Sequence, residues 1–517
     1  MSDQLDTLLR VYLPIVLVLL IAAGVRMFGT ATLPVTTDEG WTTWAISEPN
    51  IVDVVEKVAA DRHPPLYFLA LAAWQRVAGE SAIALRLLNV LVGVLTVALV
   101  YRVADETFGR TAKAGHEDIS WYAMLIYAVL PIAVYYTQEI RHYGWFTAAT
   151  VLSSLAFVRV LRSPTNRRLI LYSLSVALMM YLLYYGVWLA LIQAFTVLVL
   201  WRGNYLRKWR TTWVDRGKVG LAWLGALVIY APWLFVIARQ QWGLLGNGIG
   251  AAPGTFSSSA TDVLRLMELL LGGGLALTLG LYIVGLWGTL VSDRTDATLG
   301  LRFANPLWLG EVYIMLAGAG GFFLLVIANN FVGVLSARTT VFLTPLLAMI
   351  VAAGVVRQRI GVRWSLLVGY LLVSLFLAPV FQPRLDSPSA AATLASQYQP
   401  GDLIVLETGW DDNAFRYAMR QALGTDANII RTLPYVNNRD ENVPVVPQIE
   451  DQLQAATRIW VVQWLQPPQV IPYLDSADSG FTRMAELRSD VGGQYRGQYA
   501  RYGAADDVWI VGYSQSP

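Results

Sequence analysis

Two adjacent carboxylates, Asp38 and Glu39, follow the first apolar segment of the chain. A charged group at membrane depth costs roughly 2.5–3.5 kcal/mol on insertion scales, so acids at a membrane boundary usually serve a function. Neighbouring carboxylates raise each other's proton affinity, and one of them could act as a general base on an acceptor hydroxyl. The alternative is a structural pair, in which one carboxylate caps a helix end beside a solvated neighbour.

A second group of residues could bind phosphate. Glu139, Arg141 and Tyr143 lie in the segment Tyr-Tyr-Thr-Gln-Glu-Ile-Arg-His-Tyr, residues 135–143. An arginine there can hold a phosphate through two parallel hydrogen bonds. His63, which precedes two prolines, could add a hydrogen bond or a positive charge, and Arg338 opens a later apolar segment. The alternatives are an aromatic belt with flanking charges, a surface histidine, and a nonspecific headgroup contact.

One acidic pair in the tail could ligate a metal ion. Asp411 and Asp412 are adjacent there, but aspartate is also favoured where a helix begins, and we prefer that interpretation. We therefore predict no metal site.

The composition places these residues on a membrane protein. Hydrophobic residues make up 56% of the 517 and charged residues only 14%, against about 25% charged in a soluble domain. One crossing takes about 20 apolar residues, and we predict eleven spans. They cover residues 11–29, 84–103, 119–136, 143–161, 169–186, 187–201, 218–237, 270–291, 307–328, 340–356 and 364–381. The segments 169–186 and 187–201 could also be one broken span.

The distribution of basic residues decides between these topologies. With eleven spans and a cytoplasmic N-terminus, the inside segments hold 19 Lys and Arg, and the outside segments before residue 382 hold nine. The positive-inside bias thus places the loop 30–83 and the tail 382–517 outside the membrane. No small-residue cleavage site follows the first apolar stretch, which we interpret as a retained anchor.

The outer segments have structure of their own. In the loop 30–83, residues 51–60 have the spacing of an amphipathic helix lying in the interface, and Pro64-Pro65 starts a second helix over residues 66–77. The loop 239–260 is rich in Gly and Ser, as a lid or a solvated connector would be. The tail alternates short apolar strands (401–406, 428–431, 458–463, 508–513) with helices (413–423, 449–456). We predict a membrane domain, residues 1–381, and an extracytoplasmic α/β domain, residues 382–517.

All the candidate groups are predicted at one membrane face. Acids and cations that converge beside lipid suggest chemistry on a lipid-linked phosphate. The acid would deprotonate an acceptor, and the cations would stabilise the departing phosphate.

These motifs resemble the GT-C glycosyltransferases, over roughly residues 10–380. Asp38-Glu39 followed by His63-Pro64-Pro65-Leu66 is similar to the protein O-mannosyltransferase and aminoarabinose-transferase group, glycosyltransferase family 39 and its bacterial relatives. The stretch from Gln138 to Tyr143 is similar to their Gln-Glu-x-Arg-x-Tyr. Arg338 matches their late arginine at the start of a span.

The resemblance implies a polytopic α-helical GT-C enzyme with an inverting mechanism. It would move a sugar from a polyprenyl-phosphate carrier to a lipid, glycan or protein acceptor at the outer face of the plasma (inner) membrane. Asp38 would be the base, Glu39 and His63 would place acceptor and donor, and Arg141 and Arg338 would bind the carrier phosphate. No divalent metal or other cofactor is implied, and the partners are these substrates and the bilayer, not nucleic acid.

Two other functions compete with this one. A transporter or flippase of lipid-linked sugars should show inverted repeats with matching broken spans, and we find no such symmetry. A sensor with an outer ligand-binding domain would leave Asp38 and His63 without a task.

Overall fold

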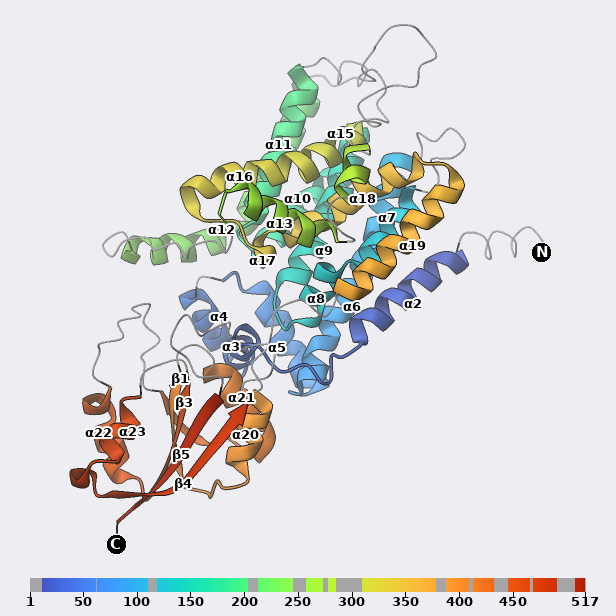
Figure 1. The fold of residues 1–517 in the computed structure, drawn as a ribbon. Helices are drawn as coiled ribbons and strands as arrows, with labels where there is room; N and C mark the ends of the chain where they lie inside the picture. The colour runs from blue at the N-terminus through green and yellow to red at the C-terminus, as the bar shows by residue number, and fades with distance from the viewer. Residues whose placement is uncertain are drawn as a thin grey trace, which may run out of the picture. The chain divides into compact units, whose positions relative to one another are not determined.

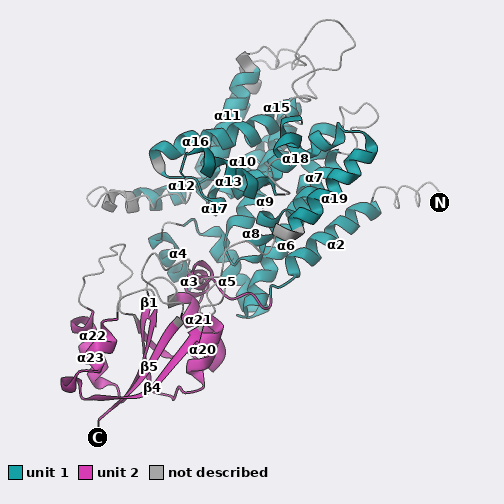
Figure 2. Cartoon of the chain, in the orientation of Figure 1, with its two compact units in different colours: residues 1–30, 49–381 teal, residues 31–48, 382–517 magenta. Residues whose placement is uncertain are grey.

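The structure is a computed structural model, and it forms two compact units. It describes residues 12–61, 63–109, 119–202, 213–244, 257–272, 278–284, 309–377, 387–408, 412–431, 445–464, 468–490 and 507–516. Unit 1 comprises residues 1–30 and 49–381, and unit 2 comprises residues 31–48 and 382–517 (Figure 2). The segment with Asp38 and Glu39 therefore groups with the tail.

Unit 1 is a bundle of helices (Figure 1). Most are apolar on all sides, as helices in lipid are, whereas α4 carries Asp53, Glu56 and Lys57 on one side and buries Val54 and Val58 on the other. The helices are α2 (Leu13–Met27), α4 (Ile51–Ala60), α5 (Leu66–Ala78), α6 (Ala82–Ala104), α7 (Ile119–Val129), α8 (Pro131–Gln138), α9 (Tyr143–Arg162), α10 (Asn166–Leu182), α11 (Gly186–Arg202), α12 (Trp213–Leu244), α13 (Ala260–Leu271), α15 (Leu309–Met315), α16 (Gly321–Val332), α17 (Ala337–Thr340), α18 (Thr344–Val356) and α19 (Ile360–Leu377).

The helices coincide with most of the predicted spans. Segments 169–186 and 187–201 form two helices, α10 and α11, separated by residues 183–185. Much of the predicted span 270–291 and of the loop 239–260 lies outside the described residues. Within the described ranges, five helices are long and apolar enough to cross a membrane, or six if the bent pair α7–α8 counts as one span. The count of eleven stays a prediction.

A proline separates α7 from α8, and an arginine forms hydrogen bonds with carbonyl groups at the end of α7. Pro131 has no N–H to give to the carbonyl group of Tyr127, and the two helices meet at 55°. Arg26, fully buried, donates to the carbonyl oxygens of Ala128 at 2.6 Å and Tyr127 at 3.5 Å. Gln138 at the end of α8 donates back to the carbonyl oxygen of Arg26 at 3.0 Å. The chain entering residues 139–143 is thus fixed to α2.

Unit 2 contains a five-stranded sheet in the order β2-β1-β3-β5-β4. Strands β2, β1 and β3 are parallel, and β5 and β4 continue the sheet antiparallel. Helices α20 and α21 pack on one face and α22 and α23 on the other (Figure 1). The elements are α3 (Thr37–Ile46), α20 (Ser387–Ala395), β1 (Leu403–Thr408), α21 (Asp412–Leu423), β2 (Asn428–Arg431), α22 (Val446–Ala455), β3 (Arg458–Trp464), α23 (Val470–Leu474), β4 (Phe481–Asp490) and β5 (Asp507–Gln515).

The α/β tail that the sequence predicts is confirmed, with one strand missed. The four predicted strands correspond to β1, β2, β3 and β5, and the two predicted helices to α21 and α22. Strand β4 was not predicted because it is an edge strand with Arg483, Glu486 and Arg488 along it. It lacks the apolar run of a buried strand.

A buried glutamate in β1 makes unit 2 sensitive to pH. Glu407 is 1% exposed, and its Oε1 accepts hydrogen bonds from the N–H groups of Gln469 at 2.5 Å and Val470 at 3.1 Å. Burial raises the pKa of Glu407 from 4.5 to about 7, against the lowering effect of these two bonds. Because the folded state holds the proton more tightly, this contribution to stability is complete below pH 4.5 and is lost as pH rises through 7.

We expect Glu407→Gln to remove this pH dependence. Glutamine keeps an oxygen that can accept the two backbone bonds but cannot ionise. The wild-type loss between pH 4.5 and 8 should be on the order of 3 kcal/mol of unfolding free energy in unit 2. Hydrogen exchange of the β1 and β3 amides, corrected for the intrinsic effect of pH, measures it in the full-length protein. An equal loss in the variant would assign the pH dependence to another group.

Candidate active site

Helix α3 carries the two predicted acids, and they differ in their surroundings. Glu39 is fully buried, and its Oε2 accepts the backbone N–H of Thr36 at 2.8 Å. The Thr36 hydroxyl accepts the backbone N–H of Glu39 at 3.2 Å, which completes a capping box. Asp38 is half-buried in the first turn, where the helix dipole stabilises a negative charge. Glu39 therefore fixes the start of the helix that presents Asp38.

The tail holds α3 in place. Within unit 2, α3 packs against α21 near Asn413, which is 2% exposed. A Cβ on Gly40 would lie 2.5 Å from the carbonyl carbon of Asn413 and closer still to the backbone nitrogen of Ala414. Only glycine allows this approach, so the residue two positions after Asp38 seats the helix on the α/β domain.

The other predicted residues lie in unit 1, where a compact group forms around Arg141. We call His63, Arg141, His142 and Tyr143 the Arg141 cluster. Arg141 is 4% exposed, and its Nη2 lies 3.3 Å from Nε2 of His63. The same His63 nitrogen lies 3.3 Å from a carboxylate oxygen of Asp61. The Arg141 guanidinium sits 5.9 Å from the ring centre of Tyr143.

A single polar residue in α6 holds the turn that carries Arg141. Asn89, fully buried, donates to the carbonyl oxygens of Glu139 and Arg141, the latter at 3.2 Å. Trp145 Nε1 in turn donates to the Asn89 side-chain oxygen at 2.9 Å. Sequence reasoning missed Asn89, although a lone asparagine in an apolar helix is a signal, because a buried amide needs several partners.

His142 also belongs to this site and was missed as a separate candidate. Its ring is fully buried, 5.1 Å from the ring of His63 and 4.5 Å from that of Tyr143. Burial, followed by the positive charges of His63, Arg141 and Arg338, holds the pKa of His142 well below its usual range. Neither ring nitrogen has a hydrogen-bond partner among the described residues. A neutral imidazole there offers one donor and one acceptor.

The remaining two candidates occupy different positions. Glu139 is 5% exposed and lies in the same turn as Arg141. Arg338 is exposed in the short helix α17, which Ser336 and Thr339 cap. The structure therefore gathers His63, Glu139, Arg141 and Tyr143. The positive charge of Arg338 contributes to the lowered pKa of His142. Asp38 and Glu39 lie in unit 2.

The described residues hold no group of three or more His, Cys, Asp or Glu side chains arranged to bind a metal ion. Asp411 lies outside the described residues, and Asp412 is the first residue of α21.

The chemistry of the Arg141 cluster suits an anionic ligand. Guanidinium and imidazole groups beside aromatic rings can bind a phosphate in a setting where water is scarce, and charge-assisted bonds are stronger there than in water. One carboxylate, Asp61, lies 3.3 Å from the His63 ring and can accept a hydrogen bond from it.

Comparison with known proteins finds a family model that matches the part of the chain with this geometry. Residues 62–236 match the family model for dolichyl-phosphate-mannose-protein mannosyltransferases. This range contains the Arg141 cluster, Glu139 and Asn89. No curated protein matches the chain by sequence.

Several solved structures share the fold. ArnT from Cupriavidus metallidurans, bound to undecaprenyl phosphate, matches with a TM-score of 0.60 at 11% identity, over 96% of this chain and 97% of that one. The apo oligosaccharyltransferase of Archaeoglobus fulgidus matches at 0.55 and 11% identity, over 89% and 70%. The arabinofuranosyltransferase AftD from Mycobacteria matches at 0.52 and 16%, over 96% and 41%. The family match covers about a third of the chain, so the comparisons show a resemblance to the protein mannosyltransferases over residues 62–236 and, across most of the chain, a fold shared with these three transferases.

Proposed function

We propose that the protein transfers a sugar from a polyprenyl-phosphate carrier to a hydroxyl of a lipid, glycan or protein acceptor, with inversion. The observation that carries this proposal is the buried Arg141 beside His63, which together suit a phosphate. The structural relative bound to undecaprenyl phosphate supports a carrier of this chemical class. The proposed orientation has the N-terminus in the cytoplasm and the reaction at the outer face of the inner membrane, as the positive-inside bias favours.

In the proposed reaction, the Asp38 carboxylate accepts the proton of the acceptor hydroxyl. The acceptor oxygen attacks the anomeric carbon of the sugar, and the bond from that carbon to the phosphate oxygen breaks. Polyprenyl phosphate leaves with the bonding electrons, and Arg141, His63 and Arg338 stabilise its added negative charge. The imidazole of His142, which burial keeps neutral, makes a hydrogen bond to the sugar-phosphate substrate.

A transfer assay tests this function. The purified full-length protein in lipid nanodiscs, given a labelled polyprenyl-phosphate sugar and a membrane extract as the source of acceptors, should consume donor and release polyprenyl phosphate in equal amounts. Movement of intact donor across the bilayer of proteoliposomes, without release of polyprenyl phosphate, would favour the transporter alternative. The family match is to enzymes and gives that alternative no support.

In this proposal the tail positions Asp38, because α3 packs against α21. We expect Gly40→Ala to lower the transfer rate at least tenfold, because the added methyl group displaces α3 from Asn413 and so moves Asp38. Overpacking of this kind costs about 1–3 kcal/mol. Transfer rates and hydrogen exchange of residues 31–48 measure the two effects together. Gly369→Ala in α19 is the matched control, since a Cβ at Gly369 meets nothing within 4 Å. A full rate in Gly40→Ala would show that this contact does not position Asp38.

A further inference from the structure

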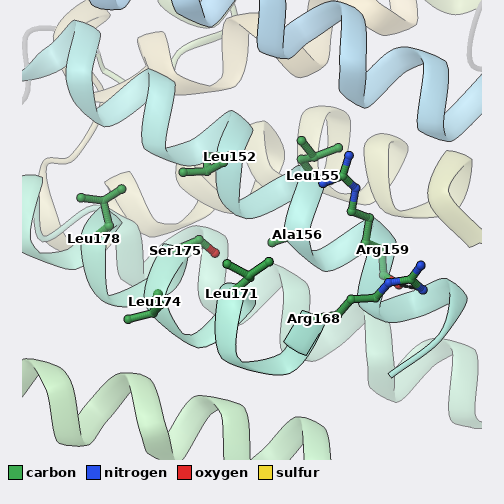
Figure 3. A pocket seen from close by; sticks show the side chains of 9 residues that line it. All are labelled: Leu152, Leu155, Ala156, Arg159, Arg168, Leu171, Leu174, Ser175 and Leu178. Atoms are coloured by element: carbon green, nitrogen blue, oxygen red, sulfur yellow. Dashed lines mark hydrogen bonds between the residues drawn. The ribbon is translucent and has the colours of Figure 1, made fainter. Parts of the chain in front are cut away.

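A leucine-lined groove lies between α9 and α10, apart from the Arg141 cluster (Figure 3). It encloses about 200 Å³, and leucines such as Leu155 and Leu178 form its walls. Leu171 and Leu174 are each 49% exposed, so the groove opens away from the protein interior. Ser175 also lines it, but its hydroxyl donates to the carbonyl oxygen of Tyr172 at 2.7 Å, which leaves the groove apolar.

Two arginines form the polar end of this groove, Arg159 and Arg168. Arg159 reaches Glu106 at 3.4 Å, and Glu106 also pairs with Arg162 and, at 3.5 Å, with Arg102. Glu106 thus faces three guanidinium groups, of which that of Arg102 also pairs with a second carboxylate, Asp105, at 3.1 Å. Arg168 donates to the carbonyl oxygens of Arg159 and Ser163, both at 3.2 Å, so its hydrogen bonds within the described ranges go to backbone and not to a carboxylate. The end of the groove is therefore cationic.

The groove is remote from the proposed reaction. Arg141 lies just before the first residue of α9, and Arg159 lies near its last. From Tyr143 to Arg159 the helix rises about 24 Å, most of the thickness of the hydrocarbon core. Because α9 is long and apolar enough to cross a membrane, we expect the two arginine sites at opposite faces.

We propose that this groove binds an anionic phospholipid. One acyl chain lies along the leucines, and the headgroup phosphate contacts Arg159 and Arg168. The charge argues for an anionic lipid, because the choline of a zwitterionic headgroup would bring a positive charge toward a region with an excess of arginine. Basic sites between helices at a membrane face bind anionic headgroups in this way.

Lipid binding to the full-length protein tests the proposal. We expect native mass spectrometry to give a higher affinity for phosphatidylglycerol than for phosphatidylcholine. Arg168→Gln should weaken phosphatidylglycerol binding about fivefold, and Arg168→Lys should restore most of it. Arg167→Gln is the matched control, because Arg167 is the exposed neighbour outside the groove. It should change the affinity less than twofold.

A variant that fills the groove distinguishes lipid binding inside it from attraction to the surrounding positive charge. Ala156→Leu puts a larger side chain into the lined space and should weaken the binding of both lipids. Equal affinities for the two lipids, or equal losses in Arg167→Gln and Arg168→Gln, would overturn the proposal in favour of a diffuse basic surface. Displacement of phosphatidylglycerol from the wild type by polyprenyl phosphate, lost in Ala156→Leu, would also overturn it, because the groove would then be a carrier site.

Discussion

Asp38→Asn should lower the turnover number by about 10²–10⁴-fold while leaving the protein folded and inserted. Removal of a general base has an effect of this size. Asparagine keeps the shape of the side chain but cannot accept the proton of the acceptor hydroxyl. Initial rates of polyprenyl phosphate release by the purified protein in nanodiscs, with the thermal unfolding midpoint as a check on folding, give the result.

The neighbouring carboxylate supplies the control for this prediction. Glu39→Gln makes the same change of charge one residue away, but glutamine can still accept the Thr36 N–H in the capping box. We expect its turnover to stay within about tenfold of the wild type. If Glu39→Gln proved the more damaging of the two, the base and the cap would have to exchange roles.

Arg141→Ala should weaken donor binding by about 10–100-fold, since a hydrogen bond to a charged group contributes roughly 1.5–3 kcal/mol. The affinity for the acceptor should change little, because the proposed contact of Arg141 is with the carrier phosphate. The KM values for donor and acceptor, measured separately, distinguish these effects. His63→Gln should weaken donor binding in the same direction, because His63 lies 3.3 Å from the guanidinium.

A surface arginine of the same unit serves as the comparison. Arg76 in α5 donates to the carbonyl oxygen of Pro49 at 3.1 Å and takes no part in the Arg141 cluster. Arg76→Ala should leave both KM values close to those of the wild type. An unchanged donor KM in Arg141→Ala would remove Arg141 from the phosphate site.

The sequence predicts those parts of the fold that local patterns encode. Apolar length predicts most of the helices of unit 1, and Pro65 marks the start of α5. The alternation of short apolar segments predicts four of the five strands of unit 2. These features depend on residues that are neighbours in the chain, so periodicity and turn residues suffice to find them.

Contacts between distant segments could not be predicted from the sequence. The approach of Gly40 to Asn413 joins residues that are far apart in the chain, and nothing local marks either of them as a partner. The bonds from Asn89 to residues 139 and 141 are of the same kind, and they decide how Arg141 is held. The capping box of Thr36 and Glu39 is a local motif and could have been found. It explains why the two adjacent acids have different surroundings.

The position of a bound carrier tests the central claim most directly. An experimental structure of the full-length protein with polyprenyl phosphate should place the phosphate within hydrogen-bonding distance of the Arg141 guanidinium and the His63 ring. A phosphate bound elsewhere, with the Arg141 cluster making no contact to it, would contradict this account of the site.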